Sequence, residues 1–335
     1  MNASKPGRLA SIAALAATAL ALWMPQVVVA QTAEASKWPT RLVKIRVGFP
    51  PGGTTDVLAR VIGQKLQDAL GVPVVIENRA GAVGSLDASI LAKAAPDDHV
   101  FMMVPPGIQA INQFLYQSVG YDAEKDFVTV GLVAQCPNVL AVHPALPFTT
   151  FQGLVAYAKA NPTKLNYSIS GVGASGHLLT ELVKSKTGIS MQYVPYKGNG
   201  PALMALVGGE VQVNTDCNPQ LLQYVKSGKV RALAVSSDKR WDELPDVPTF
   251  AELGYPDLTM QVWYALIAQA KTPKEVVARM NRELNAVLKQ PEVVAHLREM
   301  NLSTLQTDPA YAAAFVTRER DRWKEIVRIS GARLE

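Results

Sequence analysis

Apolar and polar positions along this chain follow two periods in turn, which predicts strands alternating with helices. Short runs rich in β-branched residues are followed by stretches whose apolar positions recur every three to four residues. In the first half the predicted order is strand, helix, strand, helix, strand, at 43–49, 55–70, 74–77, 86–94 and 100–104. This order favours a parallel, doubly wound α/β sheet, which binds ligands outside the carboxyl ends of its strands.

A second series of the same kind follows, and the last third of the chain is mostly helical. The second series has predicted helices at 150–160, 174–187, 200–206 and 221–226, and predicted strands at 164–169, 191–195, 211–215 and 230–236. Two α/β lobes are therefore expected. We place lobe one at 37–140 together with 250–335, and lobe two at 141–249.

The first thirty residues have the pattern of a secretory signal. Lys5 and Arg8 precede an apolar stretch at 9–24, and small residues precede the expected cleavage after Ala30. The apolar stretch is shorter than the roughly 20 residues that a spanning helix needs, and Pro25 ends it. We expect a signal peptide at 1–30, cleavage, and a mature protein in the periplasm, with no other segment able to cross a bilayer.

Composition narrows the function further. The net charge of the chain is +5, and removal of the signal peptide leaves +3 without a basic block, so nothing indicates nucleic acid. The four histidines are scattered with no metal-ligand spacing, and we expect neither a metal nor a cofactor. Cys136 and Cys217 are the two cysteines. An exported protein can form a disulfide, but two isolated cysteines are no framework, so we favour buried free thiols over a bridge.

Two glycine-rich loops, at 48–56 and 168–177, each connect a predicted strand to a predicted helix. In the first, Gly52 and Gly53 allow a ligand to approach the backbone closely. A helix N-terminus has unpaired N–H groups and a partial positive charge, so it holds small anions without a basic side chain. We expect Asp56 to order its loop, since its charge would repel an anion. One loop in each lobe suggests a clamp for a small carboxylate.

The second loop also fits a dinucleotide-binding pattern, with glycines at positions 171, 173 and 176. That pattern requires an acidic residue at the end of the following strand. This strand ends in Val194-Pro195-Tyr196-Lys197, which contains no acid. An exported protein also has little access to nicotinamide cofactors. We therefore set dinucleotide binding aside.

A serine hydrolase is the alternative enzyme class. The segment around Ser175 resembles a nucleophile elbow, but His177 stands where that motif needs glycine. Ser175 and His177 are two residues apart on a helix, so their side chains do not face each other. We interpret His177 as a packed, hydrogen-bonded histidine near the loop rather than a base.

Several ordered motifs give the chain a specific resemblance over the whole mature length. It resembles the Bug-type solute receptors, the extracytoplasmic binding proteins of tripartite tricarboxylate transporters. The motifs are FPPGGTTD, VIENRAGAVGS, LNYSISGVGASGH, VPYKGNGPAL, LVGGEVQV, KVRALAVSS, LPDVPTFAELG and KTPKEVVARMN. The resemblance implies a type II periplasmic-binding-protein fold, in which two α/β lobes close on a carboxylated solute.

The resemblance also implies the ligand-binding residues, which act largely through backbone amides and hydroxyls. They are Phe49, Gly52, Gly53, Thr54 and Thr55 in lobe one, and Ser168, Ser170, Gly171, Gly173, Ala174 and His177 in lobe two. Asp216 sits where the family often has an aspartate after a strand. Its place at a strand end also predicts a position at the cleft, where it could accept from an amine, a hydroxyl or a water. The alternative for Asp216 is a turn residue before Asn218-Pro219.

The resemblance implies capture of a small organic carboxylate and its delivery to integral membrane transporter subunits by a monomer. A ligand-sensing subunit for a membrane sensor is the other non-enzymatic alternative. Pro105, Pro106, Tyr196 and Trp263 would give an apolar or aromatic wall if they face the cleft. That composition leans toward an aromatic or extended dicarboxylate rather than citrate. For Trp263 and Tyr264, however, we favour the core over the cleft wall.

Overall fold

The computed structural model describes residues 38–95 and 97–333. The chain divides into two compact units, Met1–Thr40 and Arg41–Glu335, and every helix and strand below belongs to the second. The expected signal peptide at 1–30 lies outside the described residues and stays a prediction. Within the described part of the chain, no helix combines the length and the apolar character needed to cross a membrane.

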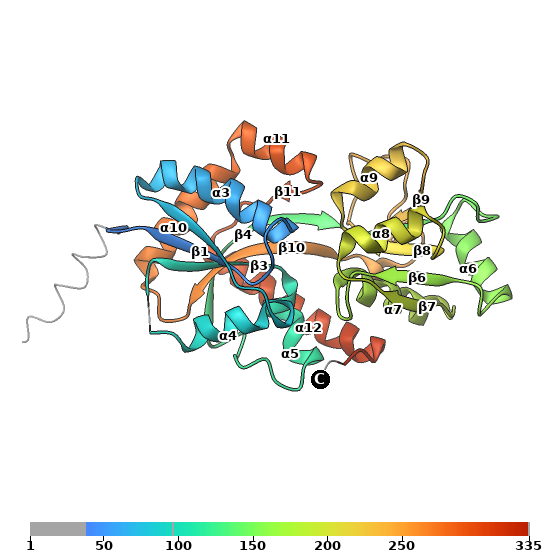
Figure 1. The fold of residues 1–335 in the computed structure, drawn as a ribbon, viewed down its shortest axis with the longest axis horizontal. Coiled ribbons are helices and arrows are strands. Elements are labelled where there is room, and N and C mark those ends of the chain that lie inside the picture. The colour runs from blue at the N-terminus through green and yellow to red at the C-terminus, as the bar shows by residue number, and fades with distance from the viewer. Residues whose placement is uncertain (1–37, 96, 334–335) are drawn as a thin grey trace, which may run out of the picture. The chain divides into compact units, whose positions relative to one another are not determined.

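The second unit contains two sheets, and the first of them has six strands (Figure 1). Strands β1, β2 and β3 are parallel, and the long β10 runs antiparallel between β3 and β4. Its order is β11-β4-β10-β3-β1-β2. The strands are β1 (Val43–Val47), β2 (Val74–Asn78), β3 (Val100–Val104), β4 (Phe127–Pro137), β10 (Gln261–Gln269) and β11 (Ser303–Thr304). The helices that accompany it are α3 (Thr54–Leu70), α4 (Ser85–Lys93), α5 (Asn112–Leu115), α10 (Lys274–Leu288), α11 (Pro291–Glu299) and α12 (Pro309–Ser330).

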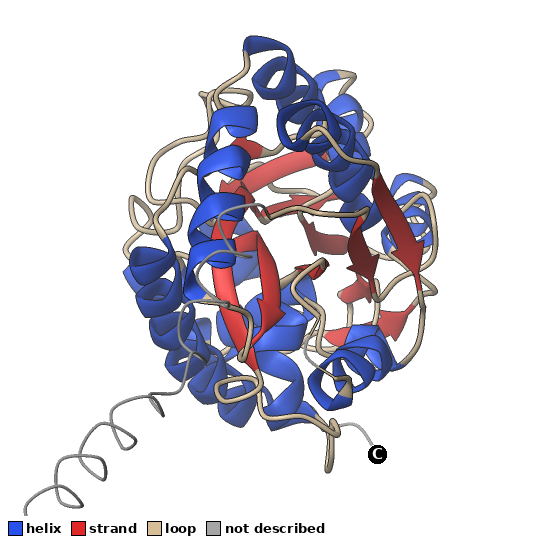
Figure 2. Cartoon of the chain, turned by 90° about the vertical axis from the view of Figure 1, so that its left-hand side faces the viewer, coloured by secondary structure: helices blue, strands red, loops and turns tan. Residues whose placement is uncertain are grey.

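A five-stranded sheet forms the second lobe, in the order β7-β6-β8-β5-β9. Strand β6 is parallel to β7 and β8, whereas β5 runs antiparallel to β8 and β9. The strands are β5 (Val139–Val142), β6 (Asn166–Ile169), β7 (Gln192–Pro195), β8 (Val213–Asp216) and β9 (Arg231–Val235). Its helices are α6 (Phe151–Ala160), α7 (Ser175–Thr187), α8 (Asn199–Val207) and α9 (Pro219–Lys226). Figure 2 shows helices around both groups of strands.

The expectation of two α/β lobes is confirmed, with one refinement. Both sheets are mixed rather than wholly parallel, because β10, β4 and β11 join the first sheet antiparallel and β5 joins the second. Strand β4 was not predicted. The predicted helix at 55–70 ends where expected, at Gly71, whose φ of 71° is the left-handed conformation that glycine adopts most easily.

The two sheets connect through a very short crossing. Strand β4 ends at Pro137 in the first sheet, and β5 begins at Val139 in the second, so Asn138 alone separates them. Asn138 is fully buried, and its N–H donates to Ser236 Oγ at 2.8 Å while Ser236 N–H donates to its carbonyl at 2.9 Å. The chain returns to the first sheet after Ser236, and Met260 N–H donates to the Ser236 carbonyl at 2.8 Å. These bonds hold the two crossings side by side.

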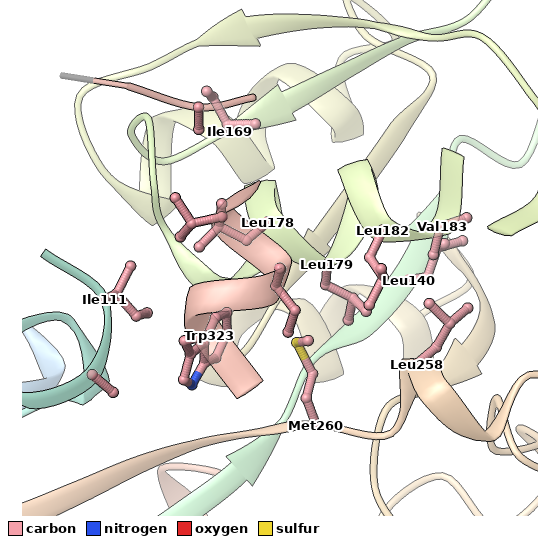
Figure 3. Packing of buried hydrophobic residues seen from close by; sticks show 14 of the residues in the cluster. Ile111, Leu140, Ile169, Leu178, Leu179, Leu182, Val183, Leu258, Met260 and Trp323 are labelled. Atoms are coloured by element: carbon pink, nitrogen blue, oxygen red, sulfur yellow. The ribbon is translucent and has the colours of Figure 1, made fainter. Parts of the chain in front are cut away.

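Helix α12 packs against both groups of elements. It contacts β4 and the short helical turn at Gly107–Ile111 on one side, and α7 on the other. The indole of Trp323 is fully buried and belongs to the same core cluster as Leu178, Leu179 and Met260 (Figure 3). One large apolar cluster therefore includes residues of both lobes, and a second cluster, with Val139, Leu206 and Leu221, packs within the second lobe.

Candidate ligand-binding site

Both glycine-rich loops lie on the wall of one cavity of about 860 Å³. The wall is formed largely by residues that follow β1 and β3 in the first sheet and β6 and β8 in the second, at the carboxyl ends of parallel strands. It also includes residues that follow β2 and β7 and residues of β10. Most of the predicted ligand-binding residues line it. They are Phe49, Gly52, Gly53, Thr54, Thr55, Ser170, Gly171, Gly173, Ala174 and Asp216.

Asp56 orders the first loop through hydrogen bonds and does not itself line the cavity. The Gly52 N–H donates to Asp56 Oδ2 at 2.8 Å, and Gly52 has a φ of 87°. Asn78 Nδ2 donates to Asp56 Oδ1 at 2.9 Å, and Arg60 Nε donates to Oδ2 at 3.0 Å. Burial raises the pKa of Asp56, but these three partners outweigh it and lower the pKa overall. The expectation that Asp56 orders the loop is confirmed.

Two of the predicted residues lie behind the second loop rather than on the cavity wall. Ser168 and His177 are both buried and neither lines the cavity. Ser168 Oγ accepts from Asn214 Nδ2 at 3.0 Å, within the sheet. His177 Nδ1 accepts from the Gly173 N–H at 3.1 Å, which fixes the loop across its turn. The His177 bond therefore acts on the loop itself, whereas the Ser168 bond lies within the sheet.

The acceptor role of Nδ1 requires the neutral form of His177, with its proton on Nε2. Burial lowers the pKa of His177, which favours that form. The ring packs against the rings of Tyr167 and Tyr193, with centroids 6.4 Å and 5.3 Å away, and these two rings also contact each other. The interpretation of His177 as a packed histidine is confirmed.

Among the described residues, the Ser175 hydroxyl is hydrogen-bonded to an amide and not to a base, although Ser175 lines the cavity. Its hydroxyl donates to Asn138 Oδ1 at 3.2 Å, and the nearest histidine in sequence, His177, uses Nδ1 for the Gly173 N–H. An amide oxygen accepts a hydrogen bond but cannot remove the proton of a serine. The arrangement joins the cavity to the crossing between the sheets and does not form a nucleophile.

Close packing explains the glycine at the start of α7. A Cβ on Gly176 would lie 1.8 Å from the Thr215 carbonyl oxygen, so only glycine lets α7 meet the end of β8. This contact brings the N-terminus of α7 next to Asp216, the last residue of β8. The two parts of the cavity wall in the second lobe are thereby fixed to each other.

Asp216 is the one carboxyl group among the described residues on the cavity wall. Its Oδ1 accepts from Asn199 Nδ2 at 2.9 Å and from the Cys217 N–H at 2.8 Å. Its Oδ2 is buried and has no partner in the described part of the chain. Burial raises the pKa of Asp216 to about 7, although the Cys217 N–H favours the charged form. An unpaired buried oxygen at a cavity is suited to a ligand group.

Four helices of eight residues or more have their first residue on the cavity wall. These residues are Thr54 of α3, Ser175 of α7, Asn199 of α8 and Pro219 of α9. The first N–H groups of a helix have no intrahelical acceptor and point out of its end. Among the described residues that line the cavity there is no lysine, arginine or histidine. The favourable field for an anion therefore comes from backbone groups.

The aromatic wall differs from the expected one. Pro105 and Pro106 line the cavity as expected, but Tyr196 and Trp263 do not. Trp263 is fully buried, with Nε1 donating to Glu319 Oε2 at 3.1 Å, so it is a core residue as favoured. Its neighbour Tyr264, for which the core was also favoured, lies on the cavity wall with its side chain hydrogen-bonded to Thr54. Adjacent residues of a strand point to opposite faces of the sheet, so Trp263 faces the core while Tyr264 faces the cavity.

Sequence reasoning missed several residues of the cavity wall. They come from the loop before α4, from the segment after β3 and from the starts of α8 and α9, and they are Val83, Ile111, Asn112, Leu115, Tyr116, Asn199 and Asn218. The motif VPYKGNGPAL includes Asn199, but the start of the helix within this motif was not predicted to be part of a site. The apolar members carry none of the polar chemistry by which candidate residues were chosen.

Cys136 and Cys217 form a disulfide, so the preference for free thiols is wrong. Cys136 lies on β4 of the first sheet and Cys217 follows β8 of the second, with Cα atoms 6.0 Å apart. That distance suits a disulfide. The bridge joins the two sheets, and Cys217 lines the cavity beside Asp216.

Comparison with known proteins identifies the family. The chain matches the tripartite tricarboxylate transporter family receptor profile over residues 58–332. BugT of Bordetella pertussis is 36% identical over 308 residues, covering 92% of this chain and 94% of BugT. The solved structure of R. palustris Rpa4515 with adipate is 38% identical, with a TM-score of 0.80, over 89% of this chain and 100% of that one.

A third relative, MatC (Rpa3494) from Rhodopseudomonas palustris with bound malate, is 31% identical, with a TM-score of 0.76, over 87% of this chain and 100% of that one. These relatives are solute-binding receptors and not enzymes, which confirms the resemblance and removes the hydrolase alternative. The chain belongs to the tripartite tricarboxylate transporter receptor family, the periplasmic solute-binding receptors that include the Bug proteins.

Proposed function

We propose that this receptor captures a small organic carboxylate in the cavity and delivers it to the membrane subunits of a tripartite tricarboxylate-type transporter. The observation that supports this most is the pair of glycine-rich loops, one from each sheet, on a single cavity with four helix N-termini. Backbone N–H groups at helix N-termini bind anions. One carboxylate would be shared between the first turn of α3 and the first turn of α7.

We propose the predicted residues that line the cavity as direct contacts of the ligand, with His177 as a residue that shapes the second loop and Ser168 behind it. Thr54 and Thr55 offer hydroxyls as well as N–H groups at the start of α3. The unpaired Oδ2 of Asp216 would meet a donor of the ligand, or would donate to a second carboxylate when protonated.

Closure of the two lobes on the ligand is the proposed mechanism, with lobe one at 37–140 and 250–335 and lobe two at 141–249. A ligand that contacts both loops has a higher affinity for the closed arrangement, so it shifts the population toward it. The short crossing at Asn138 is a suitable hinge because one residue connects the sheets there. The receptor is proposed to work as a monomer in the periplasm, after cleavage behind Ala30.

An extended dicarboxylate is the proposed class of ligand. Pro105, Pro106, Ile111 and Leu115 make part of the cavity wall apolar, alongside the helix N-termini. The related Rpa4515 was solved with adipate, a diacid with an apolar middle. An acid with charged ends and an apolar middle would match both kinds of wall.

Thermal unfolding of the mature protein against a panel of acids tests this function. The panel contains aliphatic, aromatic and amino acids, citrate, and the neutral diamide of each diacid as a control. A ligand present at 100 times its Kd adds about 2.7 kcal/mol to the free energy of unfolding. We expect a rise in Tm with at least one diacid and none with its diamide. No rise with any acid, after unfolding and refolding to remove carried-over ligand, would contradict the proposal.

A further inference from the structure

The loop before α4 places the β-branched side chain of Val83 at the cavity, in a backbone conformation that β-branched residues rarely adopt. Val83 lines the cavity and has φ 51° and ψ 40°, in the left-handed region. Its neighbour Ala82 also has a positive φ, of 45°. A β-branched residue is a genuine outlier in this region because its branched Cβ crowds the backbone. Such outliers persist only where the surrounding structure imposes them, and they cluster at functional sites.

The surroundings of Val83 impose this conformation. A Cβ on Gly48 would lie 2.7 Å from Gly84 Cα, so the loop presses directly against the end of β1. A Cβ on Gly84 would lie 2.8 Å from Ile108 Cδ1, on the other side. Asn112 Nδ2 donates to the Val83 carbonyl at 3.3 Å and to Ser85 Oγ at 2.8 Å. The backbone of the loop is therefore fixed from three directions.

Packing within the protein does not account for a valine at this position. The Val83 side chain keeps 48% of its surface exposed, although the residue belongs to the cavity wall. An exposed valine contributes little apolar burial, and in the left-handed region it is worse than glycine. The isopropyl group is thus largely uncovered at the cavity wall. Other apolar residues of the cavity wall include Phe49 and Ile111.

We infer that Val83 is a specificity-determining residue, whose isopropyl group packs against the hydrocarbon middle of the bound acid. This inference rests on the proposed function and deepens it, because it says which part of the ligand is selected. The loops at the helix N-termini hold a carboxylate that every acid shares. Val83 would favour acids with a longer apolar body, because only those reach it and bury it.

The test compares the affinities of the mature wild-type protein, Val83→Gly, Val83→Ala and a control for succinate, adipate and suberate by titration calorimetry. Val294→Ala is the matched control, because Val294 is 40% exposed on α11 and does not line the cavity. We expect Val83→Gly and Val83→Ala to weaken the longer diacids on the order of five- to tenfold, as expected for one or two lost methyl contacts. Succinate should change less than about twofold, and the control should not change the profile.

The Tm of each variant without ligand separates this role from a structural one. Glycine relieves the left-handed strain but makes the unfolded chain more flexible, so Val83→Gly should keep its Tm or raise it. A lowered Tm with an equal loss of affinity for all three diacids would overturn the inference, as would an unchanged profile. If the wild-type protein binds none of the diacids or other acids, the proposed function fails, and the inference fails with it. If the wild type binds and the profile is unchanged, the inference alone fails.

Discussion

The Ser175 hydroxyl donates a hydrogen bond to Asn138 Oδ1 at 3.2 Å, across the boundary between the cavity and the crossing of the sheets. Ser175 is the first residue of α7, and Asn138 is the single residue between β4 and β5. The loop that is proposed to hold the carboxylate is thus tied to the proposed hinge by a side-chain bond. A substitution of one of these residues should therefore affect the other.

Ser175→Ala breaks this tie and should cost stability more than binding. The variant leaves the buried Asn138 Oδ1 without its donor, which lowers the free energy of unfolding by about 1–2 kcal/mol. The backbone N–H groups of α7 remain, so the affinity for the ligand should stay nearly intact. Thermal unfolding and titration calorimetry of the same variant measure both. An affinity loss of a hundredfold with an unchanged Tm would contradict the account.

Gly176→Ala should prevent correct folding of the second lobe. The added Cβ would lie 1.8 Å from the Thr215 carbonyl oxygen, and a backbone atom in a sheet cannot move away cheaply. We expect a loss of several kcal/mol, above the usual range of about 1–3 kcal/mol for overpacking. Gly171→Ala is the matched control, since its Cβ meets nothing within 4 Å. Equal Tm values for the two variants would show that α7 and β8 are not packed as described.

The disulfide should stabilise the folded protein strongly. Cys136 and Cys217 are 81 residues apart, so the bridge removes much of the freedom of the unfolded chain. The double variant Cys136→Ser/Cys217→Ser should lose about 2–5 kcal/mol of unfolding free energy. Denaturant unfolding of the oxidised wild type, the reduced wild type and the double variant measures this. If reduction leaves the wild-type curve unchanged, the two cysteines are not bridged in solution.

Asp216→Asn should remove a pH dependence of stability. The pKa of Asp216 is raised to about 7 in the folded state by burial, above its value of 3.8 in the unfolded chain. Protonation therefore favours the folded state below pH 3.8, and this contribution is lost as the pH rises from 3.8 through 7. The loss is on the order of 4 kcal/mol at most.

Asparagine resembles the protonated acid and does not titrate, so the variant should be more stable than the wild type at pH 8. Its advantage should shrink as the pH falls toward 4. Denaturant unfolding at several pH values measures the difference. A constant difference between the two proteins from pH 4 to pH 8 would show that Asp216 ionises normally in the folded state.

Local patterns predicted the elements and the two loops, because a strand-to-helix turn is encoded within a few residues. The strand at 100–104 has the predicted bounds, and α3 begins one residue before its predicted start. Strands β4 and β5 were missed, although both are apolar runs that contain valines. The prediction of a parallel sheet fails at β10, which runs antiparallel to β3 and β4.

The parts of the site that depend on distant contacts could not be predicted in this way. The disulfide requires the ends of β4 and β8 to meet, and a separation of 81 residues gives no sign of that. Trp263 and Tyr264 are adjacent, and which of them faces the cavity depends on how β10 is placed in the sheet. His177 was expected at the ligand because it ends the motif, whereas the fold turns it behind the loop to hold the Gly173 N–H.

The most direct measurement is a crystal structure of the mature protein with the acid that raises its Tm most. The account predicts one carboxylate of that acid in the cavity, with its oxygens about 2.7–3.2 Å from N–H groups in the first turns of both α3 and α7. It predicts that no lysine or arginine side chain contacts this carboxylate. A carboxylate bound by a basic side chain, or bound to only one of the two loops in a closed protein, would contradict the central claim.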